Sequence, residues 1–236
     1  MPPRAFVTTR WSLVLAAGKG ARPALSKLCE LYWDPLYAFV RRQGLSAEDA
    51  KDMTQGFFTR LLEKNDLAVA DPSRGRFRAW LLTAARHYLA NEWDRERAKK
   101  RGGDQLRLPL EDAEAFFSRK HSHGLTPERA YDRRWAEMLL QRVLETLGEE
   151  YTRAGKESRF DKLKRTLTRD EGDSYANIAA ELGMEVGAVR IAAFRLRERF
   201  KELLHEEISH TVEKPEDVED ELRFLLSTFE DEDEDE

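Results

Sequence analysis

Helical periodicity dominates this sequence and limits its fold more than any other feature. Apolar residues recur every three or four positions in almost every periodic stretch, as at Leu25, Leu28, Tyr32, Leu36 and Phe39. That spacing is typical of an amphipathic α-helix. Strand-like alternation does not extend over any useful length, so the sequence predicts an all-α protein.

Local signals set the expected helix ends. Ser46 is expected to cap a helix over 47–64, with acids in its first turn. Pro35 is expected to bend or divide the helix over 23–42, and Gly148 to end a helix that starts at Pro127. Further helices are expected at 11–17, 77–100 and 215–229, with a helix-turn-helix over 174–200.

The breaks between periodic segments predict two small helical domains joined by a flexible linker. The first domain spans 24–103 and the second 126–212, with the linker at 104–125. An N-terminal extension covers 1–23 and an acidic tail covers 213–236.

Charge is segregated along the chain. The net charge is -5, but Glu213 to Glu236 holds thirteen acidic residues against two basic ones, so the rest carries about +6. A basic body of this kind is compatible with a polyanionic partner. The acidic run over 230–236 is interpreted as a disordered solubilising tail, with folding back onto the basic helices as the alternative.

Several classes of protein are disfavoured by what the sequence lacks. Cys29 lies among leucines and is expected to be a buried, inert thiol, and the histidines have no ligand-spaced partners, so neither metal nor cofactor is expected. No apolar run approaches the roughly 20 residues of a membrane span, which favours a soluble, cytoplasmic protein. There is no glycine-rich phosphate loop or nucleophile elbow, so an enzyme is not expected.

The segment from Ser174 to Phe200 has helix-turn-helix spacing. Gly183 permits the turn, and the second helix would enter the DNA major groove. An ordinary helical hairpin with a solvated basic face is the alternative.

A second segment, Phe77 to Arg101, interleaves aromatic and basic side chains. Residues 95–101 alone carry five bases and one acid. Aromatic rings stack on unpaired bases while arginine and lysine neutralise phosphates, so this helix suits DNA that is being opened. The opposing interpretation is that Trp80 and its neighbours belong to the core.

Three ordered motifs now support a resemblance to a known family. Residues 24–101 resemble the first conserved domain of extracytoplasmic-function (ECF) sigma factors of the sigma-70 family, and residues 135–205 resemble the second. The motifs are DMTQGFF from Asp52, SRGRFRAWL from Ser73, and the helix-turn-helix from Tyr175. The resemblance implies a sigma factor that binds core RNA polymerase and recognises the minus-ten and minus-thirty-five promoter elements.

The resemblance also implies roles for individual residues. Core-polymerase binding would fall to Asp52, Gln55 and Phe58. The minus-ten element would be contacted by Arg74, Arg76, Arg86, His87, Asn91, Asp94, Arg95 and Arg97. The minus-thirty-five element would be contacted by Glu185, Gly187, Ala188, Arg190, Ile191, Arg195 and Arg197.

The chain departs from the family pattern at Gly56, where an acid is common, and at Ile191 and Ala192, where polar or basic residues are common. An anti-sigma factor, or a serine/threonine kinase acting at Thr54, is a further hypothesis about partners. The linker is either a solvated spacer or an acidic mimic of RNA.

Other functions remain open alternatives. They are an operator-binding helix-turn-helix regulator, a nucleic-acid enzyme using Asp49 and Asp52, and an RNA-binding adaptor.

Overall fold

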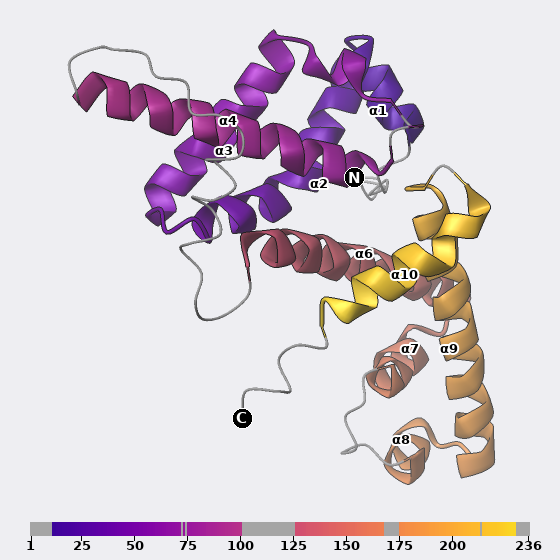
Figure 1. Ribbon diagram of the computed structural model, residues 1–236. Coiled ribbons are helices and arrows are strands. Elements are labelled where there is room, and N and C mark those ends of the chain that lie inside the picture. The colour runs from indigo at the N-terminus through magenta and orange to yellow at the C-terminus, as the bar shows by residue number, and fades with distance from the viewer. Residues whose placement is uncertain are drawn as a thin grey trace. The chain divides into compact units, whose positions relative to one another are not determined.

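The computed structural model describes residues 11–100 except 72 and 74, then 126–167, 175–212 and 214–229; side chains of 96–100 are outside this description. The described residues are helical, with no strand among them, as predicted. The α-helices are α1 (Trp11–Gly18), α2 (Arg22–Arg41), α3 (Ala47–Glu63), α4 (Phe77–Lys100), α6 (Pro127–Arg153), α7 (Glu157–Leu163), α8 (Tyr175–Leu182), α9 (Val186–Ser209) and α10 (Val218–Ser227) (Figure 1). Short 3-10 turns are η1 (Asp66–Val69), η3 (Lys164–Thr166) and η4 (Pro215–Asp217).

The chain forms two compact units. The first comprises 1–137 and 209–236, and the second comprises 138–208. Helix α6 contributes its first turns to the first unit and its remainder to the second. The C-terminal helix α10 therefore belongs to the same unit as α1 to α4, although it is far from them in sequence.

Aromatic packing fixes α4 in the first unit. Phe77, at the start of α4, is buried, and its ring meets Tyr32 of α2 edge-on with centroids 5.4 Å apart. Trp11 of α1 contacts the same ring edge-on at 5.9 Å. Leu81 and Leu89 continue this buried face along α4. Edge-to-face pairs of this kind add directionality to apolar burial, so α4 has one defined inner face and one outer face.

The second unit is a smaller helical cluster around the helix-turn-helix. Leu147 of α6, Leu163 of α7, Ile178 of α8, and Val189 and Leu196 of α9 are all fully buried. Figure 1 shows α8 joined to α9 by a tight turn. The apolar faces predicted for this segment are therefore buried, and a helix, a turn at Gly183 and a second helix follow one another as expected.

The structure confirms the helix cap predicted at Ser46 and contradicts the helix end predicted at Gly148. The Ser46 hydroxyl accepts a hydrogen bond from the Asp49 amide at 3.1 Å, as a helix cap should. Pro35 lies inside α2 without dividing it. Gly148 does not end α6, which continues to Arg153. A Cβ at Gly148 would lie 3.0 Å from the Phe160 ring, so this glycine provides room for packing rather than a helix stop.

Candidate functional site

The face of α3 predicted to bind polymerase divides into an exposed part and a buried part. Asp52 and Gln55 are exposed. Phe58 is only 6% exposed, and its ring stacks on Trp33 at 5.9 Å. The structure thus places two of the three predicted residues at the surface, whereas Phe58 supports α3 from within.

Thr54, on the inner side of the same helix, is buried. It is 1% exposed, and its hydroxyl donates to the Ala50 carbonyl at 2.7 Å. Threonine hydroxyls commonly make this bond to the preceding turn of their own helix. A kinase acting at this position would first have to open the helix.

An open depression joins the predicted polymerase-binding helix to the predicted DNA-binding helix. Asp52, Gln55 and Gly56 of α3 line it together with Tyr88 and Arg95 of α4. A Cβ at Gly56 would lie 2.3 Å from the Tyr88 hydroxyl oxygen, so a side chain there would displace Tyr88. This contact gives a physical reason for glycine at this position.

The sequence places Tyr88 in the aromatic and basic segment Phe77 to Arg101, but that pattern does not predict its packing against α3. Burial, followed by the nearby Glu92 carboxylate, raises the pKa of the Tyr88 phenol. The hydroxyl therefore stays protonated at neutral pH. No sequence signal linked Tyr88 to Gly56, because the contact joins two helices.

The outer face of α4 presents a small polar strip. His87 and Asn91 are exposed one turn apart, and the Asn91 side-chain amide donates to the His87 carbonyl at 2.7 Å. Asp94 is half-buried further along the helix. These side chains stand on the side opposite the buried leucines, which is the placement a DNA-facing strip requires.

The predicted minus-ten arginines differ in their surroundings. Arg86 is half-buried and lies 2.5 Å from the Glu128 carboxylate, and Arg95 lies 2.5 Å from Glu92. Arg95 is the more exposed, at 62% of its side chain. Arg74 and the side chain of Arg97 lie outside the described residues.

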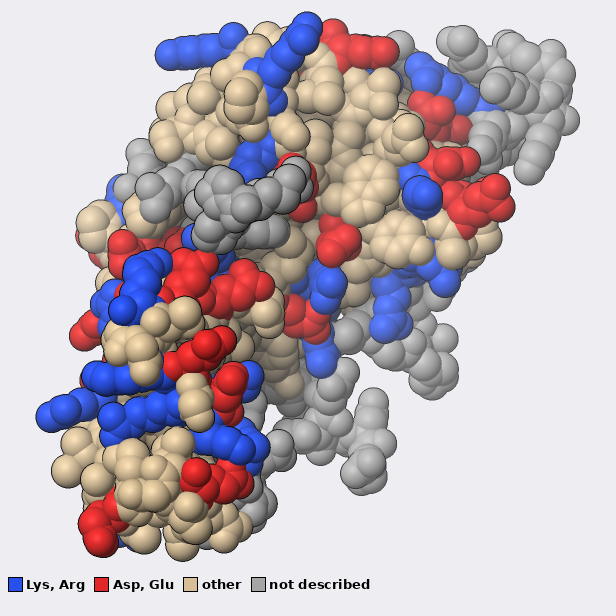
Figure 2. Space-filling model, turned by 180° about the vertical axis from the view of Figure 1, so that it is seen from behind, with Lys and Arg blue, Asp and Glu red and all other residues tan. Residues whose placement is uncertain are grey.

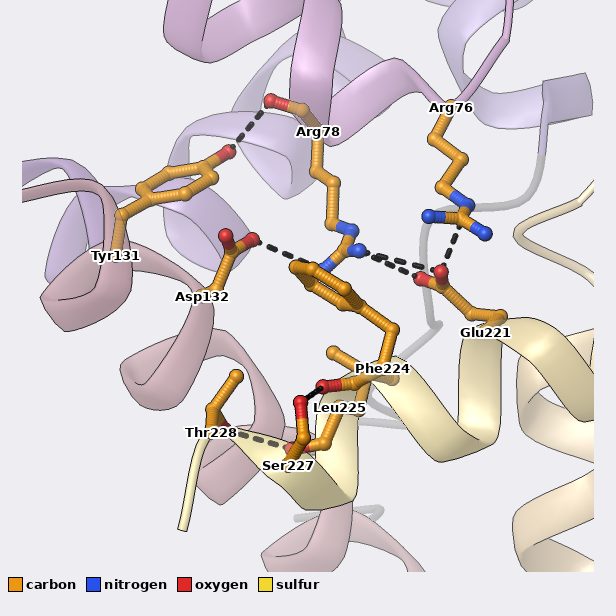
Figure 3. A network of polar contacts seen from close by, with 9 residues as sticks. All are labelled: Arg76, Arg78, Tyr131, Asp132, Glu221, Phe224, Leu225, Ser227 and Thr228. Atoms are coloured by element: carbon orange, nitrogen blue, oxygen red, sulfur yellow. Dashed lines mark hydrogen bonds and ion pairs between the residues drawn. The ribbon is translucent and has the colours of Figure 1, made fainter. Parts of the chain in front are cut away.

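Arg76 and Arg78 enter a buried ionic cluster (Figure 3). Nε of Arg76 lies 2.7 Å from Glu221 of α10, and Nη2 of Arg78 lies 3.1 Å from the same carboxylate. Arg78 also bonds Asp132 of α6 at 3.0 Å, and its backbone carbonyl accepts from the Tyr131 hydroxyl at 3.1 Å. Arg78 is therefore a structural residue, although its sequence position suggested the DNA-facing basic series.

Burial dominates the electrostatics of this cluster. It raises the pKa of Asp132 and of Glu221, and the neighbouring arginines oppose that rise without cancelling it. Burial likewise raises the pKa of Tyr131 well above its ordinary value. Desolvation that outweighs ion pairing is typical of charges placed inside a protein.

The turn between α8 and α9 is closed by the backbone. Gly183 has a φ of 62°, a left-handed conformation that suits glycine. The Met184 amide donates to the Ala179 carbonyl at 2.9 Å, which closes the end of α8. Helix α8 does not cover the outer side of the first turns of α9.

That outer side carries most of the residues predicted to meet the minus-thirty-five element. The exposed ones are Glu185, Gly187, Ala188, Arg190, Ile191 and Arg195. Ile191 is 57% exposed and Phe194, which the sequence interpretation left out, is 59% exposed. Figure 2 shows Lys and Arg side chains clustered beside uncharged surface over the second unit.

Arg197 differs from the other residues in this predicted set. It is half-buried and donates to the Tyr175 hydroxyl at 3.2 Å and to the Thr166 carbonyl at 3.4 Å. These bonds tie α9 to the start of α8 and to η3. Arg197 therefore stabilises the packing of these elements within the unit.

The described part of the chain offers no cluster of three potential metal ligands. None of its helices combines the length and apolar character that crossing a bilayer requires.

Comparison with known proteins adds independent information. Residues 28–99 match the family model for sigma-70 region 2. The chain is also similar to the ECF RNA polymerase sigma factor SigE of Mycolicibacterium smegmatis. That relative is 26% identical over 195 residues, which cover 83% of this chain and 67% of the relative. The region 2 match falls on α2, α3 and α4, the helices that carry the exposed side chains described above.

Proposed function

We propose that this chain, which is a sigma-70 family sigma factor of the ECF type, binds core RNA polymerase through α3 and promoter DNA through α4 and α9. Sigma factors act in transcription initiation without catalysing a reaction themselves, and their family partners are core RNA polymerase and promoter DNA. The observation that carries the assignment of the α3 and α4 surfaces is the region 2 match over the helices bearing exposed Asp52, Gln55, His87 and Asn91. The α9 surface rests on the exposed residues of its first turns. Because these partners act in the bacterial cytoplasm, we propose that the protein is located there.

The polymerase contact is assigned to the exposed part of α3. Asp52 and Gln55 line the open depression together with Tyr88, whereas Phe58 holds α3 in place from the core. An anti-sigma factor that competes with polymerase would cover this same surface. Regulation by a kinase at Thr54 is retained as a proposal, with local opening of α3 as its requirement.

The minus-ten contact is assigned to His87, Asn91 and Arg95, with Arg97 further along α4. Contacts to base edges specify sequence, whereas contacts to phosphates position the DNA. The minus-thirty-five contact is assigned to the start of α9, where Arg190 and Arg195 flank Ile191. Arginine can read guanine, and an exposed aliphatic side chain can contact a thymine methyl group.

Run-off transcription with purified core polymerase on pooled promoter fragments tests the role. Discrete transcripts should appear only when the protein is added, and alignment of their start sites should define the two promoter elements. Absence of both transcripts and co-elution with core polymerase on a sizing column would refute the proposal.

Paired variants test the assignment of surfaces. Asp52→Ala with Gln55→Ala should weaken binding to core polymerase, while His87→Ala with Asn91→Ala should preserve that binding and lose promoter opening. Glu30→Ala, an exposed acid on α2 outside both surfaces, serves as the control. If both double variants lose the same step, the separation of the two surfaces is wrong.

A further inference from the structure

Helix α10 inserts one acidic side chain into the first unit. Glu221 has none of its surface exposed, although it lies in the most acidic part of the sequence. Its carboxylate lies between Arg76 and Arg78 (Figure 3). Burying a carboxylate is costly unless it is paired. The pairing of the buried Glu221 with two arginines that are distant in sequence is therefore a specific contact of the fold.

Aromatic and apolar contacts hold α10 around this carboxylate. The guanidinium carbon of Arg78 lies 4.8 Å from the centroid of the Phe224 ring, and that of Arg76 lies 5.9 Å from it. Val218 and Leu225 are buried on the same helix. The ten residues of α10 thus depend on a few apolar anchors and one ion-pair cluster.

The two arginines are not equivalent. Arg78 is 5% exposed and also binds Asp132, so it remains paired inside the protein if Glu221 leaves. Arg76 has 32% of its side chain exposed and stands just before α4. It belongs to the segment expected to meet the opened minus-ten element.

We propose that α10 competes with promoter DNA for Arg76. In the docked state Glu221 neutralises the Arg76 guanidinium, and when α10 leaves, that guanidinium binds a phosphate of the opened strand. The proposal rests on the proposed function. Carboxylate and phosphate oxygens accept the same charge-assisted hydrogen bonds from arginine, so one guanidinium edge cannot serve both.

The energetics favour an exchangeable contact. Burial raises the pKa of Glu221 despite the two arginines, which indicates that the carboxylate is poorly compensated for its lost hydration. Release returns Glu221 to water and leaves Arg78 with Asp132. The acidic stretch of the C-terminus therefore acts through one buried residue of α10, and not only through its bulk charge.

The test uses holoenzyme assembled from core polymerase and full-length protein, with a single-stranded oligonucleotide carrying the non-template minus-ten sequence. Glu221→Gln should bind this strand more tightly, by about threefold or more at low salt, because Arg76 no longer has to give up its ion pair with Glu221 before it binds the phosphate. Adding Arg76→Ala to Glu221→Gln should abolish this gain. Arg76→Ala should also make the salt dependence of binding shallower by about 0.7, the change expected for the loss of one phosphate contact on a single strand.

Asp220→Asn is the matched control, because it removes one acid from the same helix where the carboxylate pairs with Arg223 on the surface. It should leave the affinity at the wild-type value. Equal affinity for wild type and Glu221→Gln would overturn the inference. A gain as large in Asp220→Asn would also overturn it, because bulk charge would then account for the effect.

Hydrogen exchange of the wild-type holoenzyme gives a second readout that does not depend on a variant folding. Amides of 218–227 should lose protection when the oligonucleotide binds, and unchanged protection would contradict the proposal. If wild type neither joins core polymerase nor binds the oligonucleotide, the proposed function fails and the inference fails with it. If wild type binds but Glu221→Gln behaves identically, the inference alone is wrong.

Discussion

Both units contain an arginine held by two carboxylates, but burial separates the two clusters. In the first unit Arg78 is 5% exposed and lies between Asp132 and Glu221. In the second, Arg199 binds Glu150 through contacts of 3.0 and 2.6 Å, and its side chain is 40% exposed. The chemistry of the pairs is the same, so any difference between them comes from their surroundings.

The pKa values of the acids shift in opposite directions. Burial raises the pKa of Asp132 and Glu221, with the arginines opposing it. The hydrogen bonds from Arg199 lower the pKa of Glu150, with burial opposing them. The ion pairs favour the charged form in both clusters, but in the buried cluster desolvation outweighs them and decides the direction of the shift.

The largest expected effect is from removing the central arginine of the buried cluster. Arg78→Met should destabilise the first unit by about 3–5 kcal/mol, because the buried Glu221 and the half-buried Asp132 lose their shared partner. Denaturant unfolding followed by hydrogen exchange in 11–100 would measure it. Arg223→Met is the control, since Arg223 pairs on the surface of α10 and should change stability by less than about 0.5 kcal/mol. Equal losses in the two variants would remove the distinction between buried and exposed clusters.

A smaller loss is expected at Arg197 in the second unit. Arg197→Ala should cost about 1 kcal/mol of stability, because the Tyr175 hydroxyl and Thr166 carbonyl lose a donor at a half-buried site. Thermal unfolding would show the loss. Binding to a minus-thirty-five duplex at a temperature where the variant is folded should change far less than in Arg190→Ala. If Arg197→Ala loses as much DNA affinity as Arg190→Ala, Arg197 contacts DNA and its role is not only structural.

The exposed cluster should contribute least to stability. Glu150→Gln is expected to cost about 0.2–1 kcal/mol, because a partly solvated pair is screened and Arg199 keeps Glu202 as a partner at 2.8 Å. Unfolding in denaturant at low and high salt would measure this, and added salt should reduce the effect. A loss as large as that of Arg78→Met would show that exposure does not decide the strength of these clusters.

Local sequence signals predicted the helices and turns within each unit more successfully than the contacts between one helix and another. Ser46 as a cap and the turn at Gly183 follow from chemistry within a few residues, and both were found. Gly148 was assigned as a helix stop, because its contact with the Phe160 ring has no local signature.

For the candidate site too, local features could be predicted and long-range contacts could not. Exposure of Asp52, His87 and Arg190 follows from helical faces that can be counted along the sequence. A helix over 215–229 was expected from the sequence, but the burial of Glu221 depends on Arg78, 143 residues away. Long-range ionic contacts leave no periodic trace, so the role of α10 could not be predicted.

The opposed pKa shifts give the subtlest test of the comparison. The pKa of Glu221 in the folded state lies above its ordinary value of 4.5, so its contribution to stability is complete below that value and is lost as pH rises through the folded pKa. The pKa of Glu150 lies below 4.5, so its contribution is present above that value and is lost as pH falls through the folded pKa.

The difference in unfolding free energy between wild type and each glutamine variant isolates these contributions. For Glu221→Gln, wild type should lose its relative advantage as pH rises from about 4 to 7, with Arg76, Arg78 and Asp132 as the charged groups facing the carboxylate. For Glu150→Gln, the relative advantage of wild type should decline only on acidification, with Arg199 and Arg153 nearby. Hydrogen exchange in each unit across this range would separate the two trends. Trends of the same sign would mean that burial does not set the direction of these shifts, and the weak hold on Glu221 that permits exchange with DNA would lose its physical basis.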